Sequence, residues 1–252
     1  MITDPVFYAV AIPAVILLGL AKGGFSGLGV LAVPMITLVV SPVQAASITL
    51  PILIVQDAVS VWVFRRRWDS RSLAILMPSA LVGVFIGYLL AARVSANAVE
   101  LAIGITSVTF GARQLYSQWH GIKRPAPSSD AVGMFWGTVS GFTSQIAHAG
   151  GLPFQIYMLP KRLERDVLIG TSALFFASVN WLKVPAYFAL GQFTRANLAT
   201  SFVLFPLAVG STVAGAWAIR RVSGEKFYVA MYIVLVVIGA KLTWSGAAQL
   251  ID

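Results

Sequence analysis

Eight long apolar runs, separated by short polar segments, dominate the pattern of this chain. They cover residues 6–40, 43–64, 73–92, 98–116, 131–159, 167–190, 198–219 and 227–244. Most of them are close to the roughly 20 residues that a helix needs to cross the hydrocarbon core of a bilayer. The pattern predicts an all-α polytopic membrane protein, with one membrane domain over residues 1–252 and no soluble domain.

Two of these runs are interrupted by glycine and polar residues. The first is too long for one ordinary helix and contains a glycine-rich segment from Lys22 to Gly29, and the fifth contains a second one from Gly141 to Pro153. Backbone that is not helical at membrane depth survives only where protein, water or a solute pairs its N–H and C=O groups. We therefore expect a broken helical hairpin in each run. Two such interruptions at corresponding positions of two halves are the best sequence indication of a transporter's binding site.

Composition and charge agree with a membrane location. Hydrophobic residues make up 58% of the chain and charged residues 11%, against about 25% charged residues in a typical soluble domain. The net charge of +9 would favour a nucleic-acid partner in a soluble protein. Here, however, Lys and Arg crowd the short loops, as they do on the cytoplasmic side of membrane proteins. We expect a lipid bilayer as partner and no nucleic acid. No basic segment precedes the first apolar run, so we expect no cleaved signal peptide.

The two halves of the chain repeat each other. At a constant offset of 128 residues, the matching positions are Pro78 and Pro206, Gly87 and Gly215, Arg93-Val94-Ser95 and Arg221-Val222-Ser223, and Gly111 and Gly239. Upstream, Gly24-Phe25-Ser26 resembles Gly141-Phe142-Thr143 at a smaller offset. Chance matches between apolar segments would not be expected to share Pro, Gly and Arg, so these matches favour a duplication. We expect repeat 1 at about 5–117, a linker at about 118–130 and repeat 2 at about 131–250, each with one hairpin and three long transmembrane helices.

Equivalent loops of the two repeats carry opposite amounts of positive charge. Residues 65–71 hold four arginines where residues 192–195 hold one, and Arg93 stands alone where residues 220–226 hold three basic residues. By the positive-inside rule, the cytoplasmic loops are 65–71, 123–124, 161–165 and 220–226. The repeats are then inverted, each hairpin starts and ends on one side, and both termini lie outside. Whether the hairpins cross fully or re-enter stays open, although residues 28–40 are short for a full crossing.

The glycine-rich segments carry a family resemblance. The segment from Gly141 to Pro153, followed by Gln155 to Pro160, closely resembles the second-half motif of the TauE/SafE-type sulfite exporters. Residues 175–176, 180–185 and 187–191 also look like that family, and 24–34 looks like its paired glycine motif without the usual glycine triplet. The resemblance covers nearly the whole chain. It implies a secondary transporter in a bacterial cytoplasmic membrane that moves sulfite, an organosulfonate or a related small organic anion, inwards or outwards.

The two hairpins supply candidate anion-binding groups. Helix N-termini present unpaired N–H groups and a partial positive charge, and glycine lets backbone approach a solute. The candidates on the two segments are Gly24, Ser26, Gly27, Thr143, Ser144, Gln145, His148, Gly150 and Gly151. The alternative is helix packing through small residues, which we prefer for Gly23, Gly83, Gly87 and Gly215.

Asp57 is the only acid well inside a predicted span, and such a residue is a functional candidate by default. We expect it to carry a proton or to pair with a lysine. Lys22 and Lys183 either attract the anion, pair with Asp57 or extend to the headgroup region. Asn180, Lys183 and Tyr187 share one helical face, which makes them substrate-binding candidates.

His148 is a second candidate for proton coupling, because imidazole exchanges a proton near neutral pH. The alternative is a hydrogen-bonded structural histidine. We expect no metal site, because no second His, Cys or carboxylate lies at ligand spacing. The lack of cysteine excludes disulfides and thiolate sites, and we expect no cofactor.

The leading hypothesis is therefore a secondary transporter that exposes one midplane anion site alternately to the two sides of the membrane. No GxxxxGK[ST] segment is present, so ion or substrate gradients, with protons as one coupling ion, would drive it. The alternatives are a membrane-embedded enzyme that uses His148 and Asp57 as base and acid, and a non-transporting accessory subunit. We expect no enzyme activity. Direction, coupling ion and a homo-oligomeric state stay open.

Overall fold

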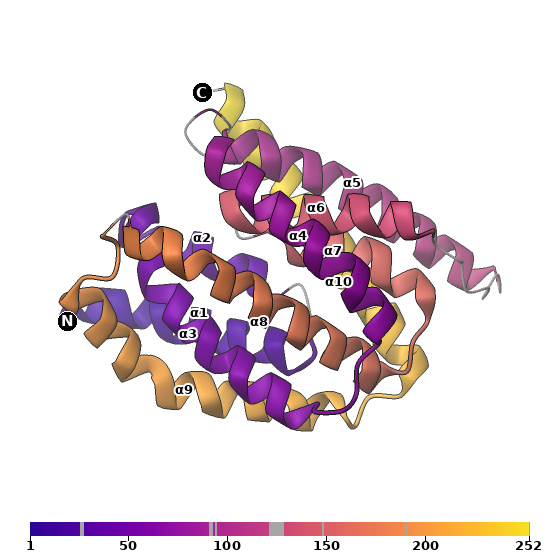
Figure 1. The fold of residues 1–252 in the computed structure, drawn as a ribbon, viewed down its shortest axis with the longest axis horizontal. Helices are drawn as coiled ribbons and strands as arrows, with labels where there is room; N and C mark the ends of the chain where they lie inside the picture. Colours follow the sequence, from indigo (N-terminus) through magenta and orange to yellow (C-terminus); the bar gives the residue numbers. More distant parts are fainter. Residues whose placement is uncertain are drawn as a thin grey trace. The chain divides into compact units, whose positions relative to one another are not determined.

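The ordered elements of the described residues are all helical (Figure 1). This computed structural model describes residues 1–25, 28–90, 93, 95–120, 129–147, 149–189 and 191–251. The elements are α1 Pro5–Gly23, η1 Leu28–Leu31, α2 Ala32–Ile36, α3 Pro42–Val63, α4 Ser70–Leu90, α5 Ala96–Trp119, α6 Asp130–Ala147, α7 Gly151–Met158, η2 Leu159–Lys161, α8 Arg165–Ala189, α9 Arg195–Ile219 and α10 Gly224–Ile251.

Within the described residues, six helices are long and apolar enough to cross a membrane: α1, α3, α4, α8, α9 and α10. The other two apolar runs form α5 and the pair α6–α7. The prediction of an all-α polytopic membrane protein is confirmed.

Local sequence sets where several helices begin. Asp4 accepts a hydrogen bond from the Val6 N–H at 2.8 Å, and Pro5 occupies the first position of α1. Ser41 caps α3 in the same way ahead of Pro42, and Thr194 caps α9. A side-chain oxygen at this position pairs an N–H that the helix leaves open, and proline has no N–H to leave open.

The helices pack into two units that do not follow the predicted repeats. Unit 1 consists of Met1–Trp68 and Ile169–Arg221, and so holds α1, α2, α3, most of α8, and α9. Unit 2 consists of Asp69–Leu168 and Val222–Asp252, and so holds α4, α5, α6, α7 and α10. Each unit therefore takes helices from both halves of the sequence.

Unit 1 is built around α1, which packs on α9 and α3. Apolar side chains of all three helices form its core, including Phe7, Val15, Ile52 and Leu204. The Gln56 amide donates to the Val15 carbonyl at 3.2 Å and the Ser60 hydroxyl to the Lys22 carbonyl at 2.8 Å, so α1 and α3 run in the same direction. The chain between them returns through η1 and α2 to the end where α1 began. This is the expected form of the first hairpin.

Unit 2 contains two close helix pairs, α4 with α6 and α5 with α10. The second hairpin lies on the first pair, because α7 runs back along α6: Ser140 donates to the Gly150 carbonyl at 2.7 Å, and Gly133 faces the Tyr157 hydroxyl. In the other pair Gly104 lies against Gly239 and Gly111 against the Tyr232 carbonyl. Helices α5 and α10 are therefore antiparallel.

Candidate functional site

A buried carboxylate in unit 1 gathers polar groups from three helices. The Lys22 ammonium, in the last turn of α1, lies 2.5 Å from one oxygen of Asp57 on α3. The Asn180 amide of α8 donates to the other oxygen at 2.6 Å. Lys183, one turn further along α8, interacts electrostatically with both Asp57 and Lys22. Asp57 and Lys183 are each only 1% exposed, and all four residues of this cluster belong to unit 1.

The face of α8 that carries the cluster is the one its spacing predicts. Asn180, Lys183 and Tyr187 are buried, whereas the intervening Trp181 and Leu182 are exposed. Lys22 does not extend outwards as a surface lysine would. Its ammonium lies 5.1 Å from the centre of the Phe176 ring, and its side chain is 14% exposed. The structure thus brings Lys22, Asp57, Asn180 and Lys183 together.

Charge balance within this cluster favours an anion when Lys22, Lys183 and Asp57 are all ionised. Two ammonium groups share one carboxylate, so the cluster carries one excess positive charge when all three groups are ionised. Uncompensated charge inside membrane-spanning helices is costly. A bound monoanion would bring the cluster to neutrality.

Gly24 serves the helix end instead of presenting its N–H to a solute. Its φ of 139° is one that side chains avoid, and its N–H donates to the Ala21 carbonyl at 3.2 Å. An added Cβ would meet the side chains of Ile169 and Ile219 at 2.9 Å. The Gly24 N–H is thus used by the end of α1, and a role of Gly24 in anion binding stays a prediction. The candidates Ser26 and Gly27 lie outside the described residues.

The polar segment of the second hairpin is more helical than its composition predicts. Helix α6 continues to Ala147, so Thr143, Ser144 and Gln145 stand on a regular helix. The Thr143 hydroxyl donates to the Val139 carbonyl at 2.8 Å, which commits its proton to the helix backbone. The Gln145 Oε1 is buried and has no hydrogen-bond partner among the described residues. His148 lies outside those residues.

Helix α6 ends at Ala147 and helix α7 begins at Gly151, so only a few residues separate the two helices. The Ala149 N–H donates to the Thr143 carbonyl at 3.2 Å, and Gly150 caps α7. A Cβ on Gly150 would overlap Ser140 and Ser144, so close packing explains this glycine. Gly151 differs, because nothing lies within 4 Å of the position its Cβ would occupy. Packing therefore does not account for Gly151.

A family model for the sulfite exporter TauE/SafE matches residues 11–242. The chain belongs to the TauE/SafE family. No curated protein and no solved structure matches it. The family assignment makes the chain a member of a group of membrane transporters, in agreement with its six candidate spans within the described residues.

This TauE/SafE protein has one further candidate that sequence reasoning missed. Gln155 on α7 is 3% exposed, and neither its amide oxygen nor its amide nitrogen has a hydrogen-bond partner among the described residues. A buried, unpaired amide costs about 1–3 kcal/mol per group unless something binds it. The only sequence signal was a polar residue inside an apolar helix. The hydroxyl of Tyr157 is also buried without a partner in the described part of the chain.

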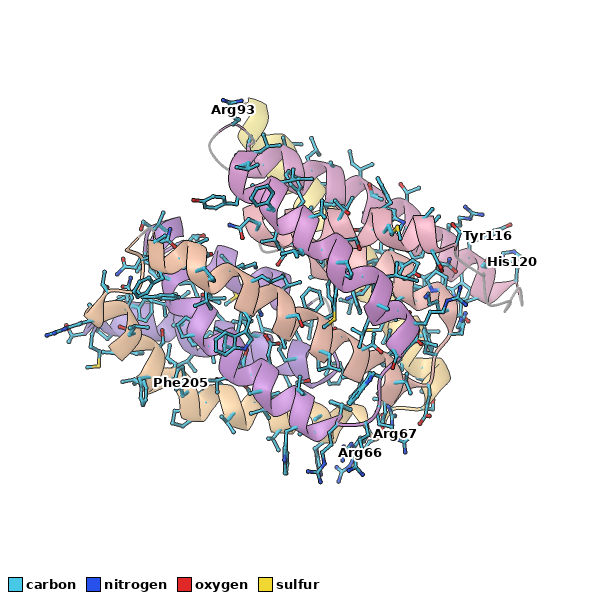
Figure 2. The ribbon with its side chains drawn as sticks, viewed as in Figure 1. Arg66, Arg67, Arg93, Tyr116, His120 and Phe205 are labelled. Carbon is cyan, nitrogen blue, oxygen red and sulfur yellow. The ribbon has the colours of Figure 1, made fainter. Side chains whose placement is uncertain are left out.

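Metal-binding geometry is not found in the described residues of this TauE/SafE chain, where no three His, Cys, Asp or Glu side chains gather. The second histidine, His120, stacks on Tyr116 at 4.0 Å at the end of α5 and is exposed (Figure 2). It is therefore not part of the buried cluster around Asp57.

Proposed function

We propose that this TauE/SafE protein is a secondary transporter that carries a small anion, namely sulfite, an organosulfonate or a related small organic anion, across a bacterial cytoplasmic membrane. The observation that carries the proposal is the buried cluster of unit 1, in which Lys22 pairs with Asp57 and Lys183 interacts electrostatically with both inside the predicted spans. Such a cluster offers an anion both charge compensation and a hydrogen-bond donor from Asn180.

The same cluster provides a route to proton coupling. With both lysines charged and Asp57 ionised, one monoanion neutralises the cluster. With both lysines charged and Asp57 protonated, one dianion does so. A dianion would then travel with one proton on Asp57, whereas a monoanion would travel alone. The protonation state of Asp57 thus links the charge of the substrate to the coupling ion.

Alternating access by inverted repeats is the second part of the proposal, and the glycine contacts support it. In unit 1, Gly19 of α1 meets Ser211 of α9 and Gly23 meets Gly215. In unit 2, Thr138 of α6 meets Gly83 of α4 and Phe142 meets Gly87. The α9 and α4 positions differ by 128 residues and the α1 and α6 positions by 119. The two helix crossings therefore use equivalent positions.

The packing of α5 on α10 supports inversion. These two helices are predicted equivalents, and they are antiparallel within unit 2. Copies in the same orientation would place equivalent helices parallel. The glycine contacts pair positions of α1 and α6 that are 119 residues apart. The sequence comparison paired Gly24 with Gly141, which are 117 residues apart, so the contacts do not support that pair. Their roles differ accordingly, since Gly24 ends a helix and Gly141 packs on Ala80.

The basic loops gather at one end of each unit, which supports the proposed membrane orientation. In unit 1, Arg220 donates to the Val63 carbonyl at 3.4 Å. In unit 2, Lys161 donates to Ser72 at 2.8 Å and the Arg165 guanidinium to the Val222 carbonyl at 2.5 Å. We assign these ends to the cytoplasm, with both termini outside.

The test is anion flux into liposomes that contain only the purified protein. Sulfite, sulfoacetate, taurine and small carboxylates are the probes. We expect Lys183→Gln to lower the rate at least about tenfold, as a lost buried charge contact does, while Lys241→Gln, on the exposed side of α10, leaves it unchanged. Equal rates for wild type and Lys183→Gln would remove the cluster from the transport path. Absence of flux for every probe with wild-type protein would favour an accessory role.

A further inference from the structure

One end of unit 1 collects five exposed arginines. Arg65, Arg66 and Arg67 follow α3, and Arg220 and Arg221 follow α9. Arg220 joins the two groups, because it donates to the Val63 carbonyl and its guanidinium lies 5.6 Å from the centre of the Phe64 ring. Figure 2 shows Arg66 and Arg67 beyond the end of α3. Two segments that are distant in sequence thus form one basic surface.

Two exposed tryptophans form part of this surface. The Arg65 guanidinium lies 5.2 Å from the Trp62 ring centre, and that of Arg221 lies 3.4 Å from the Trp217 ring centre. Trp62 is 66% exposed and Trp217 is 59% exposed, so both rings face the surroundings. Tryptophan at the end of a membrane span sits at headgroup level. A guanidinium stacked on a ring keeps its N–H edges free for an anion.

Three basic groups of unit 2, by comparison, have polar side-chain partners. Arg71 pairs with Asp130 at 3.2 Å, Arg165 with Asp166 at 3.0 Å, and Lys161 donates to Ser72. In unit 1, by contrast, residues 60–68 and 217–221 contain no Asp or Glu. None of Arg65, Arg66, Arg220 and Arg221 has a carboxylate partner among the described side chains. Their positive charge is therefore left for an external anion.

We propose that this Arg–Trp surface, made of Trp62, Arg65, Arg66, Trp217, Arg220 and Arg221, binds the headgroup of an anionic phospholipid. Guanidinium groups bind phosphate oxygens in pairs, and basic clusters beside membrane spans attract anionic lipids. The tryptophan rings supply the apolar contact for the glycerol region and the upper part of the chains. A free phosphate would use the arginines but not the exposed faces of the rings, so the combination favours a lipid.

The test is native mass spectrometry of the detergent-purified full chain, titrated with phosphatidylglycerol or phosphatidylcholine. We expect wild type to bind phosphatidylglycerol at least about tenfold more tightly, since each basic group near the headgroups adds attraction. The variant R65Q/R66Q/R220Q/R221Q should lose this preference. The control R93Q/R113Q/R195Q/K241Q removes the same number of charges from other exposed positions and should keep it.

Three results would overturn the proposal. The first is an equal loss in both variants, which would mean attraction to overall charge. The second is an unchanged preference in the first variant. The third is displacement of phosphatidylglycerol by an equal concentration of inorganic phosphate, which would mean a free-anion site. Circular dichroism and thermal unfolding check that the variants fold. If the fourfold variant does not fold, R65Q/R221Q replaces it, because this variant removes only the two stacked guanidinium groups. Because no substrate is present, the outcome is independent of transport.

Discussion

Asp57 shows how strongly one buried residue depends on its partners. Its two oxygens are held by Lys22 and Asn180, and Lys183 is close enough to interact with it. Removing one member of a buried ion pair leaves the other charge without compensation. We therefore expect Asp57→Asn to lower the free energy of unfolding by about 3–5 kcal/mol, measured by chemical denaturation in detergent.

The exposed pair of Arg71 and Asp130 is the matched control for this prediction. Its side chains are 79% and 53% exposed, so Asp130→Asn should change the free energy of unfolding by less than about 1 kcal/mol. The double variant Lys22→Gln/Asp57→Asn should recover part of the loss seen for Asp57→Asn alone, because one unpaired ammonium is removed with its partner. Equal effects at the buried and exposed pairs would contradict the ion-pair account.

How far these residues could be predicted depends on the kind of contact. The shared face of Asn180, Lys183 and Tyr187 follows from spacing within one helix, and the sequence suffices for it. That Lys22 is the partner of Asp57 depends on how α1 packs on α3. The sequence of either helix alone does not determine this packing. Gln155 was missed for the same reason, because its lack of a partner is a property of its surroundings.

At the scale of elements, glycines with similar sequence contexts have different roles. Gly141 on α6 lies against the backbone of Ala80 on α4, whereas Gly151 at the start of α7 has open space beside it. Gly141→Ala should therefore lower the free energy of unfolding by about 1–3 kcal/mol through overpacking. Gly151→Ala should leave stability unchanged or slightly raised, but should lower anion flux at least about tenfold if the space is used by the substrate.

Gly210 on α9 provides the control for both changes, because nothing lies near its Cβ position either and it is remote in sequence from the hairpins. Gly210→Ala should alter neither thermal unfolding nor flux in liposomes. A loss of stability in Gly151→Ala as large as that in Gly141→Ala would assign Gly151 to packing and remove it from the proposed site.

The elements also show where sequence patterns reach their limit. Helix starts at Asp4, Ser41 and Thr194 follow from capping chemistry, and both hairpins were expected from their interruptions. The extent of the second interruption was overestimated, since α6 runs on through Thr143 to Ala147. A glycine that permits close helix packing and a glycine that breaks a helix look the same until the neighbouring helix is placed.

At the scale of the whole molecule, repeats and units divide the chain differently. Each unit contains helices from both predicted repeats, and the chain passes between units at 68/69, 168/169 and 221/222. All three connections lie at or beside the basic loops that the positive-inside rule assigns to the cytoplasm. If these loops are cytoplasmic, as predicted, the chain passes from one unit to the other only on that side of the membrane.

Cysteine labelling tests this arrangement directly, and the chain offers a background without native cysteine. Single variants Arg66→Cys and Lys226→Cys should react with a membrane-impermeant maleimide only after vesicles of cytoplasmic membrane are opened. Asp4→Cys and Arg195→Cys should react in intact vesicles of native orientation, because the Ile2 N–H bonds Thr200 at 3.0 Å and so places the start of α9 beside the N-terminus in unit 1. Labelling of Arg66→Cys and Lys226→Cys from opposite sides would refute the inverted repeats. Labelling of both from outside would instead reverse the orientation of the whole chain while keeping the repeats inverted.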